Sequence, residues 1–344
     1  MAIECLGLEL TNRCDLACGH CLRAVVPPTS VKGVDLPLEL VRRLVTEAKA
    51  AGILHVGMTG GEPMLHPDFL AIIDHIVDEG LTYHFLSNGL GLPGFLPRWM
   101  ARPERRAPLR DVCVSIDGAT ERTHDSIRGT GTFKRSLAGL ALLRAHGLPF
   151  TLLHTITRTS KDELEQLALM AHHLGAERLI LSHFLPNGRP GATVGLDLTI
   201  AERHHAEFVV KRLIHALRFP VIMAEGYYTA VVDHVCATVD ARALNIDPNG
   251  HLTFCCELSN FNGDQQAPEA RRDFVVDMRK VSVDQAIAAM GGKIGEFRAA
   301  RLAEDAAGLR GEDDKFACRY CVRHFGKPQT SIVRLRRREI ASSP

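Results

Sequence analysis

The sequence repeats one unit, a short strand-like segment followed by a helix-like segment, from residue 4 to residue 218. Apolar segments predict strands at 4–11, 55–61, 83–89, 111–118, 149–157 and 178–186, and helical periodicity predicts helices that include 67–79, 136–147, 162–175 and 199–218. The first helix follows Asp35, its expected N-cap. Parallel strands joined by helical crossovers have both faces covered, and about six such units curl into a partial barrel. We therefore predict an α/β fold, a partial (β/α)6 TIM-like barrel whose ligands bind at the carboxyl ends of the strands.

The regular alternation stops near residue 225, and a different kind of sequence follows. A β-hairpin is expected at 245–254, where Pro248, Asn249 and Gly250 favour a turn. We predict a core domain at 1–225, a small, loop-rich, cysteine-ligated domain at 226–330 and a basic tail at 331–344.

Composition argues against two classes of partner. Of the 344 residues 46% are apolar and 24% charged, and the formal net charge of +1 provides no field that would attract nucleic acid or an anionic membrane. The first residues, MAIECLGLEL, lack a basic n-region, and no uninterrupted apolar run of about eighteen residues follows. We therefore expect a cytoplasmic protein, in which ten cysteines favour metal ligation over disulfides.

Three of these cysteines, Cys14, Cys18 and Cys21, follow the first predicted strand with the spacing C-x3-C-x2-C. Three thiolates on one loop can ligate three corners of a four-iron cluster, which leaves the fourth iron open to bind a ligand. The alternative is a zinc site, but structural zinc normally takes four protein ligands. His20 lies between two of the cysteines, where it suits packing over the cluster better than ligation.

With this triplet in place, residues 4 to about 190 resemble the radical S-adenosylmethionine (SAM) superfamily. The resemblance implies a [4Fe–4S] cluster whose open iron chelates the amino and carboxylate groups of SAM. It also implies an external electron donor, such as flavodoxin or ferredoxin, and reductive cleavage of SAM to a 5′-deoxyadenosyl radical that abstracts hydrogen from the substrate.

Further motifs at the strand ends match positions that contact SAM in this family. MTGGEP follows the second strand, SNG ends the third, SIDG ends the fourth and THDSIRG lies beyond it. Paired glycines permit close backbone approach, a carboxylate can accept from an ammonium group, and a guanidinium binds a carboxylate through two hydrogen bonds. The alternative for the arginine is a surface ion pair. The resemblance thus implies SAM contacts from Gly60, Gly61, Glu62, Asn88, Ser115 and Arg128.

A second set of cysteines consists of Cys236, Cys255, Cys318 and Cys321. Its spacing resembles the twitch domain, a shortened relative of the SPASM domain, and implies one auxiliary [4Fe–4S] cluster. A zinc ribbon is the alternative, since four cysteines in two groups also suit zinc. Cys256 could replace its neighbour as ligand, donate a hydrogen atom or pack.

Three residues are candidates for catalysis. Cys113 shares a strand face with Ser115, so its thiol should point into the barrel, although buried cysteine is more often a packing residue. Glu9 is a carboxylate on a barrel strand, either a base or part of a structural pair. His183 ends the sixth strand and has the same two interpretations.

The cluster loop begins after only thirteen residues, too few for an N-terminal peptide-recognition domain. We therefore expect a small-molecule substrate, such as a sugar, aminocyclitol or nucleoside intermediate of antibiotic biosynthesis that is oxidised, epimerised or decarboxylated. The alternatives are modification of a ribosomally made peptide, by epimerisation or crosslinking, and a non-catalytic zinc-binding interaction protein.

Overall fold

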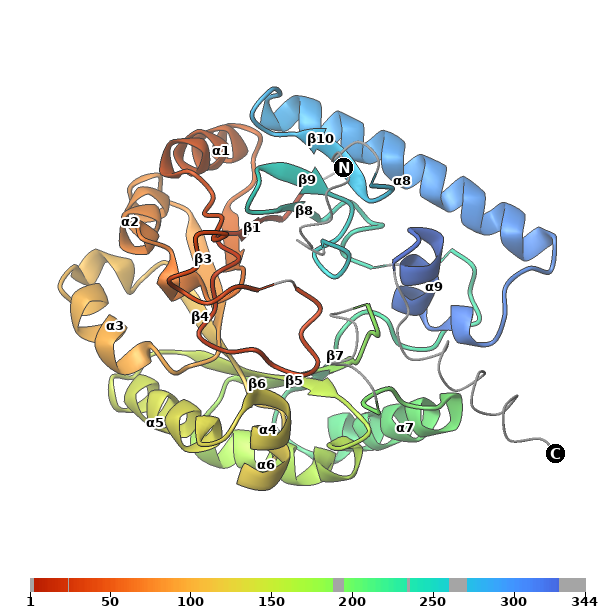
Figure 1. Cartoon of the computed structure of the whole chain (residues 1–344), viewed down its shortest axis with the longest axis horizontal. Helices are drawn as coiled ribbons and strands as arrows, with labels where there is room; N and C mark the ends of the chain where they lie inside the picture. Colours follow the sequence, from red (N-terminus) through yellow and green to blue (C-terminus); the bar gives the residue numbers. More distant parts are fainter. Residues whose placement is uncertain (1–2, 24, 188–194, 234–235, 260–270, 328–344) are drawn as a thin grey trace.

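The computed structural model describes residues 3–23, 25–187, 195–233, 236–259 and 271–327 (Figure 1). The basic tail expected at 331–344 lies outside these residues. Ten strands form one sheet in the order β10-β9-β8-β1-β2-β3-β4-β5-β6-β7. Their bounds are β1 Cys5–Glu9, β2 His55–Thr59, β3 Thr82–Ser87, β4 Leu109–Ser115, β5 Phe150–Ile156, β6 Arg178–His183, β7 Val221–Met223, β8 Ala243–Ile246, β9 His251–Thr253 and β10 Phe274–Asp277.

Helices cover the outer face of the sheet, which curves around a central space (Figure 1). Apolar side chains on this face pack between strands and helices and are almost fully buried, among them Val56 and Phe85. The helices are α1 Leu38–Ala50, α2 Phe69–Asp78, α3 Leu92–Met100, α4 Glu121–Arg128, α5 Thr132–Ala145, α6 Leu164–Leu174, α7 Ile200–Ala216, α8 Val283–Ala306 and α9 Ala317–His324.

The six predicted strand-plus-helix units are confirmed, since β1 to β6 are parallel neighbours. Three elements of the core escaped the sequence analysis, β7, α3 and the short helix α4. Strand β7 has only three residues, and α3 contains a proline in its first turn and Pro97 in its interior. Proline is tolerated in the first turn of a helix but is a breaker signal further along, so the pattern pointed to a loop.

The predicted hairpin is confirmed, because β8 and β9 pair antiparallel, but it does not stand apart from the barrel. Strand β8 pairs parallel to β1, with Leu6 opposite Leu244, and so extends the barrel sheet. The expectation of a loop-rich segment is wrong for α8, which is 24 residues long. Gly291, Gly292 and Gly295 weaken its intrinsic helix propensity, yet one face is buried, and that burial outweighs propensity.

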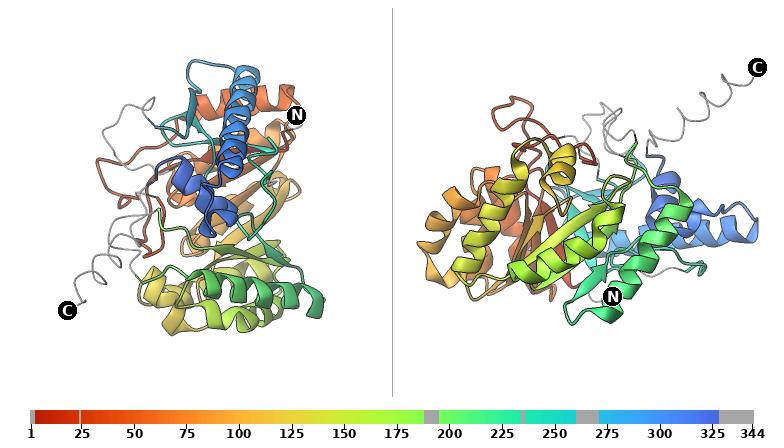
Figure 2. Two further views of the ribbon diagram at one scale, coloured as in Figure 1. Left: turned by 90° about the vertical axis from the view of Figure 1, so that its right-hand side faces the viewer. Right: turned by 90° about the horizontal axis from the view of Figure 1, so that it is seen from below.

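The loop after β1 and helix α4 lie at the same end of the molecule (Figure 2, right). This is the end where the parallel strands finish, and it positions the site described below. Among the described residues, no helix combines the length and the apolar character that crossing a membrane requires.

Candidate functional site

The loop after β1 carries Cys14, Cys18 and Cys21. It is hydrogen-bonded to the segment that leads on to α1. The Cys14 N–H donates to the carbonyl oxygen of Val26 at 2.9 Å. The predicted N-cap is wrong, because α1 has Pro37 at that position. Asp35 instead accepts hydrogen bonds from Thr11 Oγ1 at 2.5 Å and Arg13 Nε at 3.0 Å. Its carboxylate therefore fixes the base of the cysteine loop.

Gly60 and Gly61, after β2, pack directly against the backbone of that loop. A Cβ on Gly60 would lie 2.5 Å from the carbonyl oxygen of Thr11, and one on Gly61 would overlap the carbonyl group of Arg13. The Gly61 N–H donates to Thr11 O at 2.6 Å. Gly60 also has φ = 150°, which side chains rarely adopt. The glycines thus let two loops join, in addition to bordering the cavity described next.

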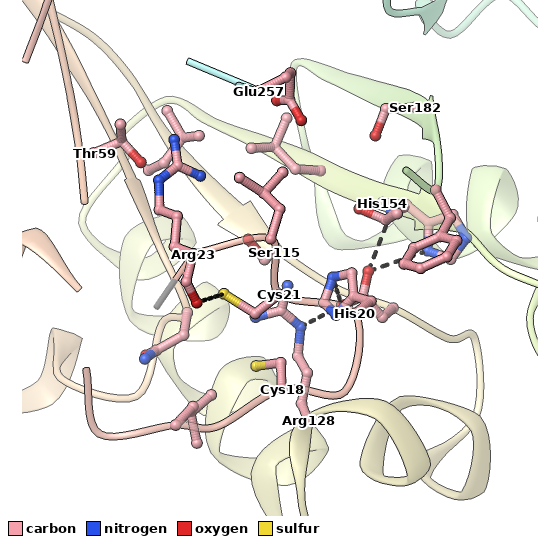
Figure 3. A pocket seen from close by; sticks show the side chains of 18 of the residues that line it. Cys18, His20, Cys21, Arg23, Thr59, Ser115, Arg128, His154, Ser182 and Glu257 are labelled. Carbon is pink, nitrogen blue, oxygen red and sulfur yellow. Dashed lines mark hydrogen bonds and ion pairs between the residues drawn. The ribbon is translucent and has the colours of Figure 1, made fainter. Parts of the chain in front are cut away.

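A cavity of about 340 Å³ lies above the strand ends (Figure 3). All three cysteines of the triplet border it. The other lining residues come from the same loop, from the ends of β2 to β6, from α4, and from the segments that follow β7 and β9. Most of the SAM contacts predicted from the sequence border the same cavity. They are Gly60, Gly61, Asn88, Ser115 and Arg128.

Glu62 is placed differently from the other predicted contacts. It is 2% exposed, and its carboxylate accepts hydrogen bonds from the backbone N–H of Asn88 at 2.8 Å and from Ser87 Oγ at 3.1 Å. Burial raises its pKa to about 7. In this structure Glu62 holds the end of β3 in place, and the Asn88 side chain in turn donates to Asp15 Oδ1 at 2.7 Å.

Asp117 organises the charged wall of the cavity. Its carboxylate pairs with Arg128 Nε at 2.5 Å and with His20 Nε2 at 3.1 Å, and it accepts from the Thr155 N–H at 3.2 Å. Burial alone would raise the pKa of Asp117, but Arg128 and His20 outweigh it and hold the pKa well below its usual range. The arginine is therefore part of a buried ionic network, not of a surface ion pair.

Several lining residues were not predicted from the sequence. Thr155 and Ser182 lie near the carboxyl ends of β5 and β6, so the strand-end rule used for Ser115 would have found them. Arg23 and Glu257 also border the cavity, and Figure 3 shows Glu257 on the side opposite Cys18. Glu257 comes from beyond β9, and no pattern in the sequence indicated that this segment returns to the barrel mouth.

The three catalytic candidates have different surroundings. Glu9 is 1% exposed and pairs with Arg23 Nη2 at 3.3 Å and with the Ser259 hydroxyl. Cys113 is also buried, two residues below Ser115 on β4, and its thiol lies 3.8 Å from Asp111 Oδ1.

His183 borders the cavity directly. Its Nε2 lies 3.0 Å from Glu207 Oε1, and burial lowers its pKa. Its catalytic role, like those of Glu9 and Cys113, stays a prediction.

A second cavity, of about 190 Å³, is bordered by the second cysteine set and is called the auxiliary cavity below. Cys318 and Cys321 occupy successive turns of α9, whereas Cys255 follows β9 and Cys236 precedes β8. The fold thus brings together four thiols that the sequence spreads over more than eighty residues. Ser182, His183, Leu185, Ala224 and Glu257 border both cavities, so the two share a wall.

None of the ten cysteines, all of which lie in the described residues, forms a disulfide. Among the residues that the structure describes, no three cysteine, histidine, aspartate or glutamate side chains lie close enough to hold one metal ion. Thiolates around a single zinc converge within about 2.3 Å of it, whereas those of a four-iron cluster each bind a different iron. The three thiols that border the larger cavity fit a four-iron cluster with one open iron.

Comparison with known proteins decides the family. The family model "Radical SAM superfamily" matches residues 8–171, a range that includes the cysteine triplet and every predicted SAM contact. This chain belongs to the radical SAM superfamily. Radical SAM proteins are enzymes, and membership implies a [4Fe–4S] cluster and SAM as cofactors, which the donor set of the larger cavity fits.

Curated relatives of this radical SAM enzyme have several activities. AdoMet-dependent heme synthase of Methanosarcina barkeri is 32% identical over 54% of this chain and 51% of its own length. Mycofactocin maturase MftC of Mycobacterium tuberculosis is 33% identical over 56% and 48%. PqqA peptide cyclase of Ruegeria pomeroyi is 34% identical over 72% and 66%. The chain thus spans about half the length of the first two.

Solved structures share the fold at low sequence identity. anSMEcpe with bound AdoMet superposes with a TM-score of 0.63 at 13% identity, over 86% of this chain and 82% of that one. SuiB of Streptococcus suis, bound to precursor peptide SuiA, gives 0.58 at 14%, over 78% and 63%. Both likenesses confirm the partial-barrel fold of a radical SAM enzyme.

Proposed function

We propose that this radical SAM enzyme modifies a ribosomally made peptide and uses a second, auxiliary iron–sulfur cluster. The observation that carries the proposal is the pair of adjoining cavities, one bordered by the cysteine triplet and the other by the second cysteine set. Cys14, Cys18 and Cys21 would hold the first cluster, and Cys236, Cys255, Cys318 and Cys321 the second. When bound, SAM and the first cluster supply a carbon radical that abstracts hydrogen.

The chain's own residues would bind and orient the cofactor. Arg128, fixed by Asp117, presents a cation to the SAM carboxylate. Asn88 and Ser115 offer hydrogen-bonding groups at the ends of β3 and β4. Glu257 lies in the wall that both cavities share, and burial raises its pKa, so it is suited to take up a proton released from a substrate there.

Two observations favour a peptide over the small molecule expected at first. The match to the peptide cyclase extends over 254 residues, well beyond the 8–171 family match, and therefore includes sequence that follows the core. The cavity volume of about 340 Å³ is near the lower end of the volumes of ligand pockets, and SAM alone is a ligand of the size that such pockets hold. A peptide substrate would insert one side chain from outside, while the rest of its chain stays out of the cavity.

The test uses anaerobically reconstituted protein with SAM, dithionite and the peptides encoded by short reading frames next to its gene. We expect a change in peptide mass together with an equivalent amount of 5′-deoxyadenosine. A panel of sugars and aminocyclitols serves as the comparison. Turnover of a sugar or aminocyclitol without turnover of any peptide would contradict the proposal and restore the small-molecule interpretation.

A further inference from the structure

Arg301 occupies a core position of α8, where the sequence pattern calls for an apolar residue. The buried face of this helix runs through Met290, Ile294, Phe297 and then Arg301, which is 3% exposed. Helix α8 passes beside α9, the helix that carries Cys318 and Cys321 (Figure 1). The guanidinium of Arg301 therefore lies among the residues that surround the auxiliary cavity.

This guanidinium lacks the partners that a buried cation needs. Among the described residues, neither its Nε nor its Nη2 has a hydrogen-bond acceptor. Its Cζ lies 5.0 Å from the ring centroid of Tyr320, a contact that favours the charge but accepts no N–H hydrogen bond. Burial of an unpaired charge is unfavourable, and an orphaned buried N–H group calls for an explanation, such as a water or an ion that binds to it.

The position of Arg301 indicates what that partner is. The side chain borders the auxiliary cavity, and its electrostatic neighbours include the thiols of Cys321 and Cys236. Arg298, one turn earlier on α8, is 40% exposed instead and pairs with Asp233 and Asp240. Of these two arginines, only Arg301, which faces inward, has no carboxylate partner among the described residues.

We propose that Arg301 is the counter-cation and N–H donor of the iron–sulfur cluster held by the four cysteines, and that it raises the reduction potential of that cluster. This inference rests on the auxiliary cluster of the proposed function. A cluster with four thiolates carries net negative charge, and reduction adds one more electron. A fixed cation and hydrogen bonds to sulfur stabilise the reduced form more than the oxidised form, which moves the potential upward.

The experiment is a redox titration of full-length protein in which Cys14, Cys18 and Cys21 are replaced by alanine, so that only the auxiliary cluster contributes. Dithionite supplies one electron per cluster, and the reduced cluster is followed by electron paramagnetic resonance. We expect Arg301→Met to move the midpoint potential to a more negative value and Arg301→Lys, which keeps the charge, to move it less. Arg298→Met is the matched control and should leave the potential unchanged.

The outcomes separate this role from the proposed function. An unchanged potential in Arg301→Met with full iron content would overturn the role and leave Arg301 as a packing residue. If Arg301→Met takes up little iron while its circular dichroism stays that of the parent, recovery of iron in Arg301→Lys supports the role and failure to recover it overturns the role. A parent protein without any iron would remove the auxiliary cluster itself, and this role with it.

Discussion

At the scale of single residues, the buried carboxylates separate into two kinds. Asp117 is ionised because Arg128 and His20 compensate for its burial. Glu9 and Glu62 have raised pKa values, about 7 in both cases, because burial outweighs the groups that hydrogen-bond to them. A carboxylate whose pKa is raised by folding binds protons more tightly in the folded than in the unfolded chain.

Glu9 therefore makes stability depend on pH. Between its ordinary value of 4.5 and its folded value of about 7, the folded chain holds more protons at Glu9, so the free energy of unfolding falls as pH rises through this window. We predict that Glu9→Gln loses less stability than wild type between pH 5 and pH 7. Urea denaturation of the iron-free protein measures this, with the exposed Glu4→Gln as control. Parallel pH profiles of wild type and Glu9→Gln would contradict the claim that burial outweighs Arg23 and Ser259 in setting the pKa of Glu9.

At the scale of elements, the site depends on loops that contact one another closely. The loop after β2 can join the cysteine loop only because glycine leaves room for the carbonyl groups of Thr11 and Arg13. Gly94, in α3, is a useful contrast, since a Cβ there would meet no atom within 4 Å.

We predict that Gly61→Ala displaces the cysteine loop and lowers iron uptake at the triplet, with a loss of stability of about 1–3 kcal/mol from overpacking. Gly94→Ala should leave iron uptake at the wild-type value and should not lower stability, since alanine is the better helix former. Iron analysis after reconstitution and thermal unfolding provide the two readings. Full iron content in Gly61→Ala would show that the two loops can separate without loss of the site.

The sequence analysis brought residues to the larger cavity where a short motif lies at the end of a strand. The cysteine triplet, the glycine pair and Ser115 border that cavity because each follows or ends a strand whose apolar pattern is plain. It failed where a tertiary contact overrides the local pattern. Helix α8 was not predicted because its glycines lower helix propensity, although burial of one face stabilises it. It also missed Glu257, since the segment that carries it returns to the cavity through contacts that no periodicity encodes, and Arg23, which follows Cys21 on the same loop but belongs to no motif used in the prediction.

At the scale of the whole molecule, one sheet carries both cavities. Strand β8 joins the second cysteine set to β1, the strand that leads into the triplet. This connection sets the two cavities on either side of the wall that contains His183 and Glu257.

Two clusters should therefore load together in one folded chain. We predict about eight irons per reconstituted chain and about four when Cys14, Cys18 and Cys21 are all alanine. Colorimetric analysis of iron and sulfide provides the count. A wild-type value that never exceeds four would remove the auxiliary cluster, and a colourless protein that contains zinc would favour the zinc alternative for the second cysteine set.

The central claim is that the triplet, and no other group of thiols, supports the cleavage of SAM. The most direct test compares two buried cysteines, Cys18, which is 8% exposed and borders the larger cavity, and Cys113, which is 5% exposed and packs beside Asp111. Reconstituted Cys18→Ala and Cys113→Ala are incubated with SAM and dithionite, and 5′-deoxyadenosine is measured by chromatography. We predict that Cys18→Ala forms none above background and that Cys113→Ala retains wild-type formation. Formation of 5′-deoxyadenosine by Cys18→Ala at the wild-type level would contradict this account.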